Sequence, residues 1–132
     1  MEVVVLTRFK NGLVQFIDQL IDWMPEDGDL VVTRILVNDQ LPITEIMGGF
    51  IKFVYPYRDL IKKSDEKFFL GDTRIFDEIK DQSRVLSLKK LWQNPRFSKD
   101  DKEKTWEWVQ FFVKCMELYL QHTGRTYEEF KQ

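Results

Sequence analysis

The sequence predicts an all-α fold, a single compact bundle of about five to seven helices. Apolar residues recur at spacings of three and four near both ends of the chain, as one face of an α-helix requires. The 132 residues also suffice for one domain with a real core, since 43% of them are hydrophobic and 14% are aromatic. We therefore expect one helical domain over residues 1–132, with a short tail at 124–132.

The first predicted helix runs from Phe9 to Met24. Its apolar positions follow helical spacing, and an adjoining stripe of apolar residues widens this face. The positions are Phe9, Leu13, Phe16, Leu20 and Trp23. Pro25 ends the helix, because the proline ring clashes with the preceding turn and proline has no N–H to donate.

Residues 30–37, LVVTRILV, form the second predicted element. Their β-branched side chains suit a buried strand as well as a helix. We predict a helix with Asp29 as its N-cap. Glu26 and Asp27 precede it, where negative charge favours the positive end of the helix dipole.

Pro42 fits the first turn of a third helix, whose apolar residues keep helical spacing as far as Val54. Pro56 then breaks or kinks the helix. Shorter amphipathic segments are expected at 57–61, 68–70, 75–79 and 85–92. Asn94 and Pro95 mark a turn.

The last predicted helix runs from Ser98 to about His122. Ser98 and Asp101 resemble a capping box in which Asp replaces Glu. The apolar positions are spaced by three and four, which predicts a central helix. They are Trp106, Val109, Val113, Met116 and Leu120. Gly124 is placed to end the helix.

Charge, cysteine content and hydropathy exclude several classes of protein. The net charge of −2 argues against a surface that binds nucleic acid throughout, and the single cysteine, Cys115, excludes an internal disulfide. The longest apolar run, Val3 to Leu6, is far shorter than the roughly 20 residues of a membrane span. No leader pattern follows the start, so we expect an intracellular protein without a membrane span.

No set of residues in the sequence predicts catalysis, a metal or a cofactor. Cys115 and His122 would lie about 10 Å apart on one helix, too far for a proton relay, and Cys115 is expected in the core. The acidic turn at 26–29 is followed by apolar residues where a calcium loop needs oxygen ligands. Gly48 and Gly49 lack the spacing of a phosphate-binding loop. We predict that the protein is not an enzyme.

Two segments are candidates for contact with partners. Residues 82–99 carry basic but no acidic side chains, and the candidate contacts to nucleic acid or an acidic partner are Arg84, Lys89, Lys90, Trp92, Arg96 and Lys99. The alternative interpretation of this segment is an amphipathic helix with a solvated charged side. Tyr55 and Tyr57 are candidates for protein contact, and core packing is the alternative there.

The segments LIDWMPEDGDL, FVYPYRDLIKKSDEKFFL, LKKLW and SKDDKEKTWEWVQFFVKCMELY carry a resemblance over roughly residues 9–120. In this order they resemble a family of small uncharacterised proteins from giant and other nucleocytoplasmic large DNA viruses. The matching positions are Pro25, Glu26, Asp27, Asp29, Pro56, Tyr57, Ile61, Asp65, Glu66, Phe68, Phe69, Lys104, Trp106, Gln110, Leu118 and Tyr119. The chain departs from the pattern at Gly28 and at Met47, Gly48 and Gly49. The resemblance implies an all-helical fold and a viral origin, and no activity.

These observations together favour a noncatalytic viral protein that binds other viral or host proteins. A small virion or assembly component is the expected role, in the host cytoplasm, the viral factory or the virion. The alternative is an accessory to viral transcription, replication or packaging that binds nucleic acid through residues 84–99. The sequence sets neither the partner nor the oligomeric state.

Overall fold

The computed structural model describes residues 2–65 and 92–131 of the chain. Helices, turns and short connections account for all of these residues, and none of them lies in a strand. The predicted all-α class is therefore confirmed for this part of the protein. The short segments expected at 68–70, 75–79 and 85–91 lie outside the described residues.

Helix α1 spans Glu2–Trp23 and begins seven residues earlier than the sequence predicts. Val5 and Leu6 precede Phe9 by four and three residues, so they extend the same apolar stripe and are buried with it. The helix ends just before Pro25, as expected from the missing N–H of proline.

Helix α2 spans Gly28–Ile35 and continues into a wider π-helical turn, η1, at Leu36–Gln40. The prediction of a helix over residues 30–37 is confirmed, but the assignment of Asp29 as N-cap is wrong. Asp27 has the extended backbone of an N-cap, and its carboxylate accepts a 3.1 Å hydrogen bond from the Asp29 N–H. Asp29 already lies in the first helical turn.

Helix α3 spans Ile43–Val54, and the carbonyl of Pro42 accepts a hydrogen bond from the Ile46 N–H at its start. At Pro56 the chain tightens into a 3-10 turn, η2, over Tyr55–Tyr57. It continues directly into helix α4, Arg58–Lys62. Pro56 thus separates two helical segments, as its ring and missing N–H require.

Helix α8 spans Lys99–Thr123, which confirms the predicted last helix. The Ser98 N–H donates to the Asp101 carboxylate and the Asp101 N–H donates to the Ser98 hydroxyl, both at 3.1 Å, so the predicted capping box is present. Gly124 has a φ of +68°, the left-handed conformation that ends helices and favours glycine. A 3-10 turn, η3, follows at Tyr127–Glu129.

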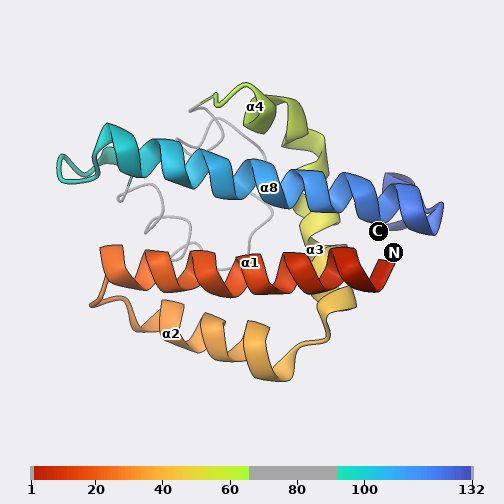
Figure 1. Cartoon of the computed structure of the whole chain (residues 1–132), viewed down its shortest axis with the longest axis horizontal. Helices are drawn as coiled ribbons and strands as arrows, with labels where there is room; N and C mark the ends of the chain where they lie inside the picture. Colours follow the sequence, from red (N-terminus) through yellow and green to blue (C-terminus); the bar gives the residue numbers. More distant parts are fainter. Residues whose placement is uncertain (1, 66–91, 132) are drawn as a thin grey trace. The chain divides into compact units, whose positions relative to one another are not determined.

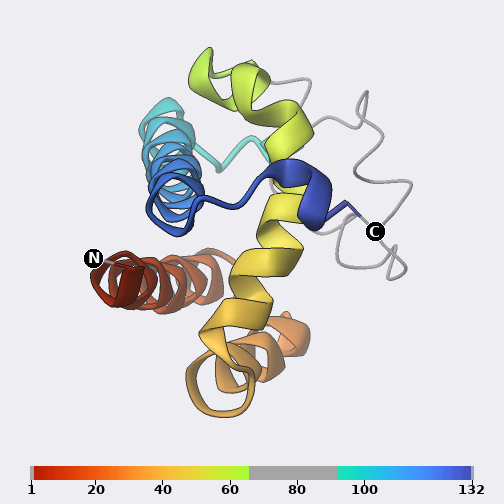
Figure 2. The same ribbon diagram turned by 90° about the vertical axis from the view of Figure 1, so that its right-hand side faces the viewer.

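The chain forms two compact units, and the predicted single domain stays a prediction. Unit 1 comprises Met1–Lys52 and Lys114–Gln132. Within unit 1, α3 crosses α1 (Figures 1 and 2), and the buried ring of Phe9 meets the ring of Phe50 edge to face at 5.3 Å. Edge-to-face packing of this kind adds to the stabilisation from burial.

The C-terminal tail packs on α3 within unit 1. A Cβ atom on Gly48 would lie 3.6 Å from the ring of Phe130, and the guanidinium of Arg125 lies 4.2 Å from the centre of that ring. An added Cβ at Gly48 would therefore make an ordinary van der Waals contact with the ring.

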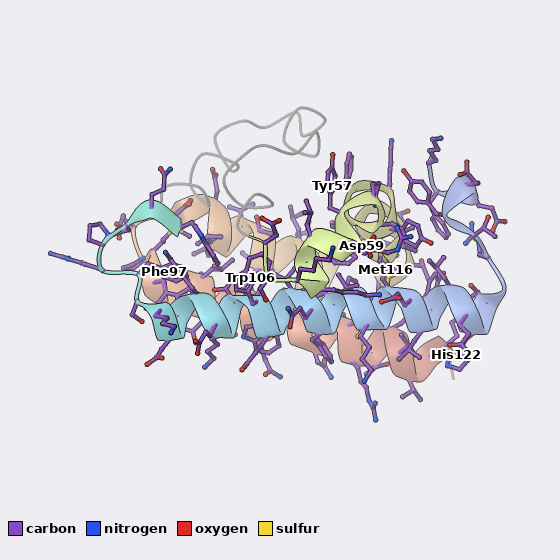
Figure 3. The ribbon with its side chains drawn as sticks, turned by 90° about the horizontal axis from the view of Figure 1, so that it is seen from above. Tyr57, Asp59, Phe97, Trp106, Met116 and His122 are labelled. Carbon is purple, nitrogen blue, oxygen red and sulfur yellow. The ribbon has the colours of Figure 1, made fainter. Side chains whose placement is uncertain are left out.

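Unit 2 comprises Phe53–Val113, and an aromatic cluster lies in its core. The centre of the buried Trp92 ring lies 5.7 Å from that of Phe97 and 5.5 Å from that of Trp106, and Figure 3 marks Phe97 near the start of α8 and Trp106 further along it. The side-chain amide of Gln110 donates to the Ile61 carbonyl at 2.9 Å and ties α4 to α8.

Replacing Trp106 with Ala should lower the free energy of unfolding by about 3 to 5 kcal/mol, because it removes a large buried ring from this cluster. Denaturant titration followed by circular dichroism measures the change. Trp108→Ala is the matched control: Trp108 is only partly buried, so it should cost less. Equal losses in the two variants would contradict the assignment of Trp106 to the core.

Two glycine substitutions should have opposite effects on stability. Gly49 lies inside α3 and a Cβ atom at this position would project into open space, so Gly49→Ala should raise the free energy of unfolding by about 0.5 to 1 kcal/mol. Gly124→Ala should lower it by about 1 to 2 kcal/mol, because alanine is strained at positive φ. Thermal and urea unfolding distinguish the two signs, and stabilisation by Gly124→Ala would exclude the left-handed helix end.

Candidate functional site

The outer side of α2 exposes an apolar surface. Val31, Val32 and Ile35, here called the α2 surface, are between 43% and 49% exposed. Spacings of three and four place Val31 and Val32 on the same side of the helix as Ile35. No residue of α2 itself is buried, although five of its eight residues are valine, leucine, isoleucine or glycine. Leu41, just after η1, is exposed as well.

The opposite side of α2 faces α1 in unit 1 (Figure 1). Leu30 is partly covered, and Val37 in the following π turn is buried. The Arg34 guanidinium donates a hydrogen bond to the Asp18 carboxylate of α1 across the edge of this contact. An ion pair this exposed adds little stability.

Negative charge surrounds the α2 surface in the sequence. Residues 11–41 carry six acidic side chains and one basic side chain, a net charge of −5. The one basic residue, Arg34, is paired with Asp18. Asp29 lies three residues before Val32 on the same side of α2, and it is exposed, as is Glu26 in the preceding turn.

The basic segment predicted from the sequence is described only in part. Arg84, Lys89 and Lys90 lie outside the described residues. Arg96 and Lys99 are exposed, as phosphate contacts require.

Trp92, the aromatic member of that segment, is 4% exposed. Its ring packs against Phe97 and Trp106, and the Lys102 ammonium lies 5.4 Å from its centre. Stacking on a base needs an exposed ring face. The nucleic-acid hypothesis therefore depends on the basic side chains alone.

Tyr55 and Tyr57 are both partly buried in the turn between α3 and α4. The Arg58 guanidinium lies 4.0 Å from the centre of the Tyr55 ring and donates a 2.9 Å hydrogen bond to the Tyr55 carbonyl. The guanidinium therefore covers part of the Tyr55 ring, and neither tyrosine is among the exposed large hydrophobic residues. Figure 3 marks Tyr57 and Asp59 on this segment.

A shallow hollow of about 270 Å³ lies along α8 in unit 2. Lys104, Glu107, Trp108 and Phe111 line it, all from successive turns of one helix. Its volume falls below the roughly 300 to 1,000 Å³ of small-molecule sites. One cation and one anion at its edge do not form the convergent set of polar groups that catalysis needs.

Cys115 and His122 do not form a reactive pair. Cys115 is buried, and burial raises the pKa of its thiol, against smaller opposing effects of Arg8 and Lys114. His122 is exposed near the end of α8 (Figure 3). Within residues 2–65 and 92–131, no three His, Cys, Asp or Glu side chains are grouped to hold a metal ion, and no helix has the length and apolar content to cross a membrane.

Comparison of the chain with protein-family models, with curated proteins and with solved structures finds no match. The resemblance to the viral family therefore stays a prediction. The site itself was missed by sequence reasoning, although its signal was present: apolar residues occur all around the segment 30–37, more than one packing face can bury.

Proposed function

We propose that the protein is a noncatalytic protein-binding module and that the α2 surface is its docking site. The observation that carries this proposal is the exposure of Val31, Val32 and Ile35 on a helix that already packs on α1 with its other side. Contiguous exposed apolar side chains beside charged residues are typical of protein interfaces. Together with the viral resemblance, this favours a small virion or assembly component.

Several finer statements belong to the same proposal. The whole chain folds as one compact bundle of five to seven helices, and the protein acts in the host cytoplasm or the viral factory of an infected cell. The absence of a catalytic set from the sequence patterns supports a role in assembly rather than in chemistry.

Val32→Asp should abolish partner binding without unfolding the protein. A carboxylate in the middle of the α2 surface would have to be desolvated in the complex, whereas in the free protein it stays in water. Affinity capture from infected cells, with mass spectrometry of the bound proteins, should show partners with the wild type that are lost with Val32→Asp. Val3→Asp, at an exposed valine of α1, should retain them. An identical set of partners for Val32→Asp and wild type would refute the docking site.

A second candidate function is nucleic-acid binding through the basic segment, favoured by the exposure of Arg96 and Lys99. If all five basic residues contacted phosphates, affinity for duplex DNA would fall with salt at a log–log slope of about −4. Lys89→Ala combined with Lys90→Ala should reduce that slope by roughly two. Fluorescence anisotropy with single-stranded and duplex oligonucleotides at about 50 mM salt tests this, because electrostatic binding is strong there. Absence of binding by the folded protein would eliminate this candidate.

A further inference from the structure

We propose that the partner of the α2 surface is a basic amphipathic helix of another protein, one that presents apolar residues on one side and lysine or arginine along its edges. This inference rests on the proposed protein-binding function and specifies its ligand. It follows from the juxtaposition of an exposed apolar helix face with the exposed carboxylates of Glu26 and Asp29 at the start of the same helix.

The shape of the surface favours a helical ligand. Val31, Val32 and Ile35 form a short ridge on a convex helix, and a second helix can pack its own side chains against such a ridge. The apolar contact is small, because three partly exposed side chains form most of it. Charge complementarity must therefore contribute to both orientation and encounter rate.

The charge of the border selects a basic ligand. Residues 11–41 have a net charge of −5, and their one cation, Arg34, is engaged by Asp18. Asp29 and Glu26 are exposed beside the beginning of α2, where they can pair with lysine or arginine on a bound helix. An acidic ligand would meet like charges that destabilise the complex.

The same charge disfavours the other occupants of an apolar face. A second copy of this chain, docked through the same surface, would bring the carboxylates of Glu26 and Asp29 near those of its partner in a symmetric interface. An anionic membrane surface or a nucleic acid would be repelled for the same reason. The basic protein helix is the occupant that satisfies both the apolar surface and its acidic border.

Three synthetic peptides of about five helical turns test the proposal with the full-length protein. All carry leucine at helical spacings of three and four, and their polar positions hold lysine, glutamine or glutamate. Fluorescence anisotropy gives the affinities, and amide NMR shifts locate the binding site. We expect the lysine peptide to bind most tightly and the glutamate peptide most weakly, with shifts concentrated in residues 28–41. The advantage of lysine should shrink between 0.1 M and 1 M salt, as the Debye length falls from about 10 Å to about 3 Å.

Variants that remove charge distinguish charge complementarity from nonspecific hydrophobic binding. Glu26→Gln combined with Asp29→Asn should lower the affinity for the lysine peptide by about two- to thirtyfold, as expected for the loss of two exposed ion pairs. The affinity for the glutamine peptide should not change. Asp27 is kept because it caps α2. Glu103→Gln, an exposed carboxylate of α8, is the matched control and should leave both affinities unchanged.

Several results would overturn the proposal: equal affinities for the lysine and glutamine peptides, shifts outside residues 28–41, no binding of any peptide, or a dimer in light scattering that Val32→Asp dissociates. The affinity-capture experiment distinguishes failure of the basic-ligand proposal from failure of the proposed protein-binding function. Partners that depend on Val32 combined with peptides that do not discriminate by charge would refute the basic ligand alone. Partners that do not depend on Val32 would refute the docking site itself.

Discussion

The apolar face of α8 is the constraint on which the rest of the structure depends. Seven hydrophobic residues in the central part of the helix are buried: Trp106, Val109, Phe112, Val113, Cys115, Met116 and Tyr119. The residues before Lys114 belong to unit 2 and the later ones to unit 1. Both cores therefore take large side chains from one helix, and the capping box and Gly124 that define its ends support both cores.

Local rules predicted the ends of α8 well because each end is set by residues adjacent in sequence. Ser98 and Asp101 satisfy each other's backbone N–H groups, and Gly124 adopts a conformation that few other residues tolerate. The start of α2 was misplaced because the turn contains two aspartates, Asp27 and Asp29, each able to cap a helix. The backbone conformation of the turn determines which residue is the N-cap, and amino-acid composition does not predict that conformation. The early start of α1 was missed although its signal was present in the sequence, because Val5 and Leu6 precede Phe9 at helical spacing.

The α2 surface shows a different limit of sequence reasoning. The pattern LVVTRILV has too many apolar residues for a helix with one buried side, and this excess also suited a fully buried strand. Local propensity cannot distinguish a segment that is buried on both sides from one that leaves a side exposed. The structure separates these cases, because Val31, Val32 and Ile35 remain exposed while α2 packs on α1. The aromatic residue Trp92 shows the reverse case: its position among basic residues favoured an exposed role, and packing with Phe97 and Trp106 buries it.

Charge is segregated along the chain, and the proposed specificity of the α2 surface depends on this segregation. The protein as a whole has a net charge of −2, yet residues 11–41 carry −5, which leaves +3 on the remaining sequence. A nearly neutral average therefore conceals an acidic region around an apolar helix face. Three partly exposed aliphatic side chains bury too little area to select a partner by hydrophobic contact alone. Electrostatic attraction between opposite charges acts before contact, and burial of the apolar side chains acts on contact. A ligand must therefore provide both a complementary charge and an apolar side. Because the charges and the apolar residues lie on the same short segment of unit 1, one helix of a partner can satisfy both at once.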